Sequence, residues 1–474
     1  MTGAAGAPAA ASDASLLATA ARYVPVGLAL FAIQLDFFSL SLAMPTISRD
    51  LGVPVTDLQW LLSAYLLSLG ASFVPAGKVG DLIGRKRTLM IGLVVFGLTS
   101  LVCGLAADPG LLIGFRAVQG IGAALIMPNA FALMGASLGE EHRAKVMGLM
   151  LGIAGVGTAL GPVVGGVLAS TAGWRWVFFI NLPVALVAAL GASRLGESYG
   201  TGHRGSLRTL DWPGVVLVMA GLAALSIGVD DVSTFGIASP ATWGPLAAGV
   251  LLLAAFALRE SRAASPLVRP ALLRNRAYVV LVVASTVANV GLNVGVLVAT
   301  LDLQSVRGLP AGASGLVFML GSIGLAVGGP VSGWLTARFG APWVLCGALV
   351  VGAGALLALA VAPDLVVFVV ALGVTGFACG MGYSVSQIGI PSILAPDEVG
   401  EGSSLLLTVL VSVGGIAVVA AGAVIELQGA TPTTASLDTT LFGTAVLLGA
   451  VGLVALVAAV LRMRHRPASP TATP

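Results

Sequence analysis

Apolar segments long enough to cross a lipid bilayer recur from residue 23 almost to the end of this 474-residue chain. A bilayer core about 30 Å thick needs roughly 20 helical residues. Lipid offers no hydrogen-bond partners to the backbone, so runs of this length form helices rather than irregular structure. We therefore expect an all-α integral membrane protein, with about fourteen spans at 23–47, 57–79, 88–107, 110–134, 144–170, 175–193, 212–230, 241–258, 277–301, 312–336, 342–362, 364–391, 402–426 and 438–461.

The composition agrees with a chain that lies mostly in lipid. Hydrophobic residues make up 57% of the sequence and charged residues 9%, whereas soluble domains carry about 25% charged residues. Too little polar surface is available to cover a water-soluble particle of this size, which excludes a soluble enzyme, a disordered protein and a nucleic-acid-binding protein. The three histidines lie in polar segments and the three cysteines in apolar ones. We therefore expect neither a metal site nor a cofactor.

Basic residues fall mostly on one of the two sides that fourteen spans define. If the N-terminus is cytosolic, nineteen of the 23 Lys and Arg lie on the cytosolic side. Arg49, Arg175 and Arg307 lie outside, and Arg116 lies within a span. Cytosolic loops of membrane proteins carry an excess of Lys and Arg. We therefore expect both termini in the cytosol.

Two loops share a glycine pattern. Gly77 and Gly84 follow the second span, and Gly333 and Gly340 follow the tenth. The match predicts two six-helix halves related by an internal repeat, the architecture of a rocking transporter. The expected domains are a disordered cytosolic tail at 1–22, a first half at 23–193, basic linkers with two additional spans at 194–276, a second half at 277–461 and a cytosolic tail at 462–474.

Two charged residues stand well away from the ends of the predicted spans, Asp36 near the middle of the first and Arg116 in the fourth. Ionisable side chains in a membrane are costly, so they usually face a cavity and have a partner. A buried carboxylate that binds a proton readily would serve proton coupling; a hydrogen bond to a neighbouring helix is the structural alternative. Their depths differ by about 7 Å along the helix axes. They can therefore meet directly or through water, unless Arg116 instead extends to the outer interface.

Several segments resemble the major facilitator superfamily and, within it, the fourteen-helix drug:proton antiporter branch. Residues 77–87 resemble the loop after that superfamily's second helix, although Leu82 stands where a basic residue is common. Segments 35–45, 116–124 and 157–166 resemble motifs of the first, fourth and fifth helices, and 174–183 and 211–214 add two further resemblances. The resemblance singles out Gly77, Gly80, Asp81, Gly84, Arg85 and Lys86 in the loop, and Gly157, Gly161, Pro162, Gly165 and Gly166 in the antiporter motif.

The resemblance implies a fold and a set of roles. The fold is two six-helix bundles plus two inserted helices. In the family the loop steadies one conformation, and the fifth-helix motif marks exporters. We expect Asp81 to cap a helix N-terminus or to meet its positive dipole.

The substrate cavity is expected to be apolar with few polar anchors. Asn289 and Asn293 share one helical face, and they either line this cavity or join helices by hydrogen bonds; the same two interpretations apply to Tyr383 and Gln387. The predicted lining is Gln34, Phe37, Phe38, Asn289, Asn293, Tyr383 and Gln387.

We expect a proton-coupled antiporter that exports small hydrophobic or amphipathic compounds (drugs, antibiotics or secondary metabolites) across the plasma membrane as a monomer. A proton would bind Asp36 from outside and leave inside as access alternates. No Gly-x4-Gly-Lys-Ser/Thr phosphate loop is present, so ATP is not the expected driving force.

Other functions stay open at this stage. A proton-coupled importer of a small organic solute and a non-transporting sensor derived from this fold are the alternatives, and an enzyme is not expected. Asp302 and Glu426 lie near the outer ends of the ninth and thirteenth spans. Each is interpreted as a solvated helix end, with a second proton site as the alternative.

Overall fold

The structure, a computed structural model, describes residues 7–464 except 56, 138–139, 198–210, 264–266, 268–269, 391–392, 395–398 and 430–431. Over these ranges the chain is helical and contains no strand. Its α-helices are α1 (Ala7–Leu51), α2 (Trp60–Ile83), α3 (Arg85–Leu105), α4 (Pro109–Ser137), α5 (Glu140–Thr171), α6 (Trp176–Phe179), α7 (Asn181–Ala192), α8 (Trp212–Phe235), α9 (Pro240–Glu260), α10 (Arg276–Leu301), α11 (Ala311–Phe339), α12 (Ala341–Ala360), α13 (Leu365–Gly389), α14 (Val399–Leu427) and α15 (Thr434–Arg464).

Thirteen helices of the described part are long and apolar enough to cross a membrane. They coincide with the predicted spans except the sixth, which is shorter and interrupted at Ile180 between α6 and α7. Pro183 explains the interruption, because it has no N–H to donate to the carbonyl of Phe179 four residues earlier. The all-α membrane fold is therefore confirmed, and two short helices stand where the sixth span was predicted.

The prediction of a disordered tail over residues 1–22 is wrong from Ala7 onward, because α1 begins there. The stretch after Ala7 is rich in alanine, the residue with the highest helix propensity. At the other end, α15 continues to Arg464, beyond the predicted boundary at residue 461.

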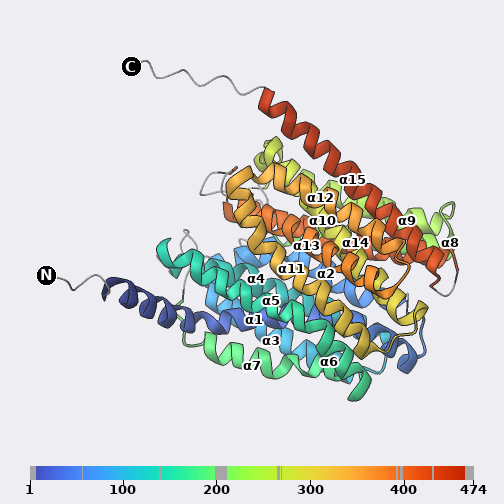
Figure 1. Cartoon of the computed structure of the whole chain (residues 1–474), viewed down its shortest axis with the longest axis horizontal. Coiled ribbons are helices and arrows are strands. Elements are labelled where there is room, and N and C mark those ends of the chain that lie inside the picture. Colours follow the sequence, from blue (N-terminus) through green and yellow to red (C-terminus); the bar gives the residue numbers. More distant parts are fainter. Residues whose placement is uncertain are drawn as a thin grey trace.

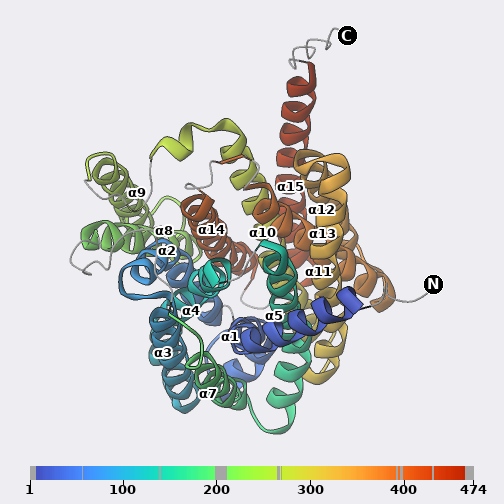
Figure 2. The ribbon, with the colours of Figure 1, turned by 90° about the vertical axis from the view of Figure 1, so that its left-hand side faces the viewer.

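The helices gather into two groups with an inserted pair beside them. Figure 2 shows α1 to α5 and α7 on one side, α10 to α15 on the other, and α8 with α9 at the edge next to α2 and α14. Helices α2 with α14 and α5 with α11 make most of the contacts between the halves. Both ends of the described chain lie at the same end of the bundle, here called the terminal side (Figure 1). The opposite end is called the far side.

Gly84 and Gly340 occupy matched positions in the two halves. Each follows the second helix of its half and precedes the third without a spacer. Their φ angles are 111° and 85°, a region that side chains avoid and glycine tolerates. Each N–H donates to the carbonyl four residues earlier, on Gly80 and Thr336 respectively. This shared turn supports the internal repeat that the two glycine patterns predict.

On the far side the two halves touch. The Gln304 side-chain amide, in a short π-helical turn at Asp302–Val306, donates to the carbonyl of Leu42 in α1 at 3.2 Å. Gly315 of α11 lies so close to Pro162 of α5 that a Cβ there would stand 2.5 Å from the proline carbonyl oxygen. The far side is therefore closed between the halves at these points.

Candidate functional site

A buried ion pair lies at the centre of the first half. Asp36 comes from α1 and Arg116 from α4, and neither side chain has exposed surface. An Arg116 Nη1 to Asp36 Oδ2 distance of 2.6 Å makes the pair direct, without an intervening water. Arg116 therefore does not extend to the membrane interface, which was the alternative interpretation of its position in the sequence. Removal of either partner would leave an uncompensated charge at a site with no exposed surface.

Further donors surround the Asp36 carboxylate. Asn181 Nδ2 donates to Oδ1 at 2.7 Å, and Gln119 Nε2 donates to the same oxygen at 3.2 Å. The Ser100 hydroxyl accepts a second hydrogen bond from each of these two amides. Every described partner of the carboxylate is a donor, so the geometry matches the ionised form.

Arg116 is held by four kinds of contact. Its Nε donates to the Leu61 carbonyl at 3.0 Å, and Nη1 donates to the Gln119 side-chain oxygen at 2.8 Å as well as to Asp36. The guanidinium carbon lies 4.2 Å from the centre of the Tyr65 ring and 6.0 Å from that of Phe178. These rings attract the cation through their π faces. Among the described residues, its Nη2 is buried and finds no hydrogen-bond partner.

Sequence reasoning singled out Asp36 and Arg116 but missed Ser100, Gln119 and Asn181 as their partners. Gln119 could have been found, because it follows Arg116 by three residues and so shares its helical face. Ser100 and Asn181 reach the pair only through the packing of α3 and α7, which no local pattern reveals.

Segment 77–87, expected to be a loop, is mostly helix, because α2 continues to Ile83 and α3 begins at Arg85. Asp81 pairs with Arg85 at 2.9 Å, and Arg85 also donates to the Ala132 carbonyl of α4 at 3.1 Å. Asp81 therefore pairs with a side chain instead of capping a helix, which was one of its two expected roles. Gly77 and Gly80 face neighbouring helices, and a Cβ on Gly80 would stand 1.6 Å from Asn129 Oδ1.

Glu197, which sequence reasoning did not single out, occupies the N-terminus of α3 instead. Its carboxylate accepts from the backbone N–H of Lys86 at 2.8 Å and of Arg87 at 3.3 Å. The Lys86 ammonium in turn donates to the carbonyls of Ser193 and Leu195, at the end of α7. An acid at this position meets the unpaired N–H groups and the positive dipole of the helix. The segment is thus tied to the sixth span.

The glycines of the fifth span lie against α1. A Cβ would stand 2.6 Å from the Phe31 carbonyl oxygen at Gly157, 2.6 Å from Phe38 Cβ at Gly161 and 2.1 Å from the Ser39 carbonyl oxygen at Gly165. These contacts bracket Asp36 on the same helix. Pro162 and Gly166 belong to the same turns; Pro162 faces Gly315 of the second half, and the Gly166 carbonyl accepts from Ser170. Glycine allows this close helix approach.

Three polar members of the predicted cavity form hydrogen bonds within the protein. Gln34 donates to the Thr158 hydroxyl at 3.0 Å, and Asn289 donates to the Leu410 carbonyl at 2.8 Å. The Asn289 bond joins α10 to α14, as the helix-joining interpretation predicts, whereas Asn293 donates to the Asn289 carbonyl within α10. The side chain of Gln387 lies outside the described residues.

The aromatic members of the predicted cavity are closer to the ion pair. Phe37 stacks on Tyr65 with ring centres 6.4 Å apart and meets Phe38 edge-on at 5.1 Å. Tyr383, from α13, packs against the same apolar cluster of the first half as Phe37 does.

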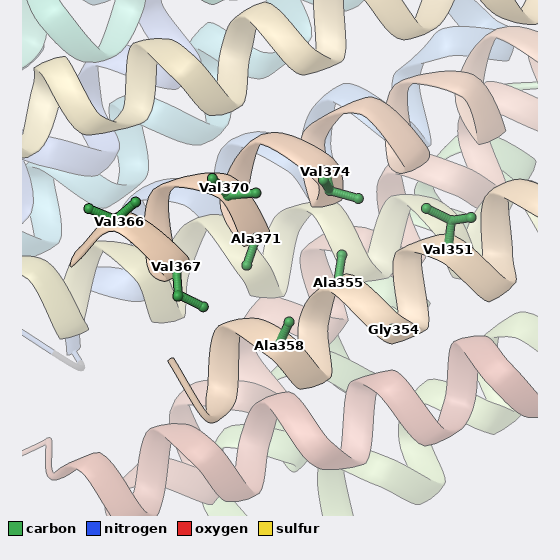
Figure 3. A pocket seen from close by; sticks show the side chains of 9 residues that line it. All are labelled: Val351, Gly354, Ala355, Ala358, Val366, Val367, Val370, Ala371 and Val374. Atoms are coloured by element: carbon green, nitrogen blue, oxygen red, sulfur yellow. The ribbon is translucent and has the colours of Figure 1, made fainter. Parts of the chain in front are cut away.

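An apolar groove lies on the second half, away from the Asp36–Arg116 pair. It is formed by α12 and α13, has a volume of about 460 Å³ and is lined only by valine, alanine and glycine (Figure 3). Val366 and Val370 on its rim are 73% and 60% exposed, so it faces outward from the second half. None of the predicted cavity residues whose side chains the structure describes lines it.

The comparison with protein families decides the classification. The family model described as Major Facilitator Superfamily matches residues 26–312 and 279–474, which together cover nearly the whole chain. The chain belongs to the Major Facilitator Superfamily. Members of the Major Facilitator Superfamily are transporters rather than enzymes.

Relatives of this superfamily member carry names of resistance and export proteins. The tetracenomycin C resistance and export protein of Streptomyces glaucescens is 35% identical over 66% of this chain and 58% of its own length. The puromycin resistance protein pur8 of Streptomyces alboniger is 36% identical over 62% and 58%. The multidrug transporter protein MdtP of Bacillus subtilis is 32% identical over 70% and 61%. The matches therefore span less than two thirds of the relatives' length.

Solved structures show the superfamily fold as well. A crystal structure of the peptide transporter POT in complex with sulfate aligns with a TM-score of 0.69 and 14% sequence identity. The alignment covers 94% of this chain and 95% of that transporter. At this identity the likeness concerns the fold alone.

Proposed function

We propose that this chain exports small hydrophobic or amphipathic compounds across the plasma membrane in exchange for protons. The terminal side is the cytosolic side in this proposal, and the far side is the outside. The excess of Lys and Arg on the terminal side supports this orientation. The names of the relatives support export of an antibiotic-like compound.

The buried Asp36–Arg116 pair is the observation that carries the proposal. Protonation of Asp36 would remove the negative partner of Arg116 and leave the arginine charge buried. Breaking a buried pair costs about 3–5 kcal/mol. A proton on Asp36 therefore disfavours the observed packing and favours another arrangement of the helices. Such a difference between states is what proton coupling requires.

The free energy that a proton gradient supplies is of the same order as the cost of breaking this pair. Each proton carries about 2.3 kcal/mol per 100 mV of membrane potential and about 1.4 kcal/mol per pH unit. One or two protons can therefore offset the cost of rearranging the pair.

Asp36 has no exposed surface in the described conformation. Proton exchange therefore requires a second conformation in which α1 or α4 moves relative to its neighbours. Two points favour rocking of the halves as that motion: the internal repeat at Gly84 and Gly340, and the discrete contacts between halves on the far side, such as Gln304 with Leu42.

Flux in inside-out membrane vesicles tests the proposal and its direction. In these vesicles the lumen corresponds to the outside, so an acid lumen should drive accumulation of a hydrophobic cation, macrolide or polyketide that the chain protects cells against. Asp36→Asn should abolish this gradient-driven accumulation, while Asp364→Asn, at an exposed helix cap, should retain it.

Three other outcomes of the vesicle experiment would contradict the proposal. Loss of the compound from an acid lumen would indicate a proton-coupled importer. Binding of the compound with no flux in either direction would indicate a sensor. Wild-type accumulation by Asp36→Asn would remove Asp36 from the coupling role.

A further inference from the structure

A second groove lies on the surface of the second half, between α11, α12 and α13. It has a volume of about 410 Å³, and its lining is apolar or aromatic throughout. Phe339 comes from α11, Trp343 and Gly347 come from α12, and Met381 comes from α13. Helix α11 starts at the far-side contact of Gly315 and therefore ends on the terminal side, so we call this the terminal-side groove.

The terminal-side groove occupies less than half of the membrane thickness. Along α12 it extends from Trp343 to Val351, a rise of about 12 Å, whereas the hydrocarbon core is about 30 Å thick. Val351 also lines the groove described above, which we call the far-side groove (Figure 3 shows Val351 at one end of it). The two grooves therefore follow one another along α12, each within one leaflet of the bilayer.

The described part of the protein leaves the terminal-side groove uncovered. A Cβ added to Gly347 would meet no atom within 4 Å. Phe339, Trp343 and Val351 are 55%, 36% and 47% exposed. In a membrane such a surface faces acyl chains, which are as apolar as these side chains. The groove therefore has the surroundings and the depth that suit one acyl chain of a lipid.

A guanidinium stands beside this groove at the membrane surface. The Arg338 guanidinium carbon lies 5.5 Å from the centre of the Phe339 ring and 5.9 Å from that of Trp334. Arg338 is exposed, and no carboxylate of the described residues pairs with it. Tryptophan is enriched at the level of the lipid headgroups, and arginine binds phosphate through two parallel N–H···O bonds. The position therefore suits a headgroup phosphate.

The far-side groove has the opposite charge at its mouth. Asp364 is exposed there and caps α13, directly before Val366 and Val367 of that groove. Arg307, which donates to the Ala362 carbonyl at the same end of α12, already pairs with Asp302. An anionic headgroup is therefore repelled at the far-side groove and attracted at the terminal-side groove.

We propose that the terminal-side groove binds a phospholipid with an anionic headgroup, taken from the leaflet on the terminal side. One acyl chain lies over Gly347 beside Trp343, and the headgroup phosphate pairs with Arg338. Basic residues at a membrane surface attract anionic lipids, and basic pockets between membrane helices bind their headgroups. The site is separate from the Asp36–Arg116 pair, and lipid binding there does not depend on the proposed function.

The charge of Arg338 also favours a lipid over a second copy of the chain in this groove. Two copies in one membrane associate most simply about a two-fold axis, which brings the same patch of each copy together. Such a contact would place two Arg338 side chains at the same depth, where they repel each other. An anionic lipid instead supplies the negative charge that the described residues do not.

Fluorescence quenching by lipids with brominated acyl chains tests the site. The full chain is reconstituted in phosphatidylcholine vesicles that contain a small fraction of brominated phosphatidylglycerol or, in parallel, brominated phosphatidylcholine. The difference between wild type and Trp343→Phe isolates the signal of Trp343. Brominated phosphatidylglycerol should associate with the Trp343 site about fivefold more strongly than brominated phosphatidylcholine, the ratio that one basic residue at a membrane surface supplies.

Two matched pairs of variants assign the preference. Arg338→Gln should bring the ratio close to one, while Arg194→Gln, an exposed arginine just after α7 in the first half, should keep it. Gly347→Leu fills the terminal-side groove and should also remove the preference. Gly354→Leu should keep it, because Gly354 has the same open space around it but lines the far-side groove.

Several results would overturn the proposal. Equal quenching of Trp343 by the two lipids in wild type would show ordinary contact with bulk lipid, whether or not any groove variant folds. A preference that persists in Arg338→Gln or in Gly347→Leu would place the lipid elsewhere, and a loss in Arg194→Gln would assign it to the overall charge of the terminal side. No quenching by either lipid would show that a protein surface, such as a second copy, covers the groove.

Discussion

At the residue scale, a charged residue within an apolar span was the most informative signal in the sequence. Asp36 and Arg116 stand out because ionisable side chains are rare in lipid. Their neutral partners could not be predicted in the same way, since serine, asparagine and glutamine occur in many spans. Asn181 meets Asp36 only because α7 packs beside α1 and α3. The proton-coupling role of the pair stays a prediction.

The pair itself can be tested by a double-mutant cycle. Arg116→Ala leaves the Asp36 carboxylate buried without its cation, so it should lower stability by about 3–5 kcal/mol and abolish export. Asp36→Ala with Arg116→Ala removes both charges and should recover much of the stability while export stays absent. Thermal unfolding in detergent and vesicle flux measure the two effects. Normal export by Arg116→Ala would contradict the account.

At the element scale, hydropathy predicted where helices lie better than how they end. The break at Ile180 and the early start of α1 at Ala7 depend on a missing proline N–H and on alanine propensity, which a search for apolar runs does not weigh. The role of Asp81 was missed for another reason. Glu197 reaches the N-terminus of α3 from the end of the sixth span, and only the packed structure brings it there.

The glycine face of α5 gives a matched test. Gly165→Ala would place a Cβ 2.1 Å from the Ser39 carbonyl oxygen, so α1 must move; Gly152, on the same helix, has open space around it. We expect Gly165→Ala to lower both the unfolding temperature and export, and Gly152→Ala to leave both near wild type. Equal effects of the two substitutions would show that close approach of α1 and α5 does not matter.

The Glu197 carboxylate offers a second test at this scale. Glu197→Gln weakens the acceptor at the N-terminus of α3 and should cost about 0.5–2 kcal/mol of stability. Asp81→Asn removes a partly exposed ion pair, for which about 0–1 kcal/mol is expected. Chemical unfolding followed by tryptophan fluorescence compares the two. A larger loss of stability for Asp81→Asn than for Glu197→Gln would contradict the assignment of Glu197 as the acceptor at the N-terminus of α3.

At the scale of the whole molecule, the repeat was predictable and the position of the inserted helices was not. Gly84 and Gly340 mark equivalent turns in the two halves, and glycine spacing alone revealed them. The place of α8 beside α2 and α14 follows from residues such as Asp230, whose partners lie some 170 positions earlier in the chain. The basic linkers on either side of α8 and α9 allow these helices many positions relative to the two halves. The sequence therefore could not predict that α8 packs beside α2 and α14.

The central claim is that a proton on Asp36 and the transported compound favour different conformations. Proton release from the purified protein in weakly buffered detergent solution, on addition of an exported compound, measures this exchange directly. Wild type should release protons on binding, and Asp36→Asn should bind the compound and release none. Equal proton release by the two proteins would contradict the account.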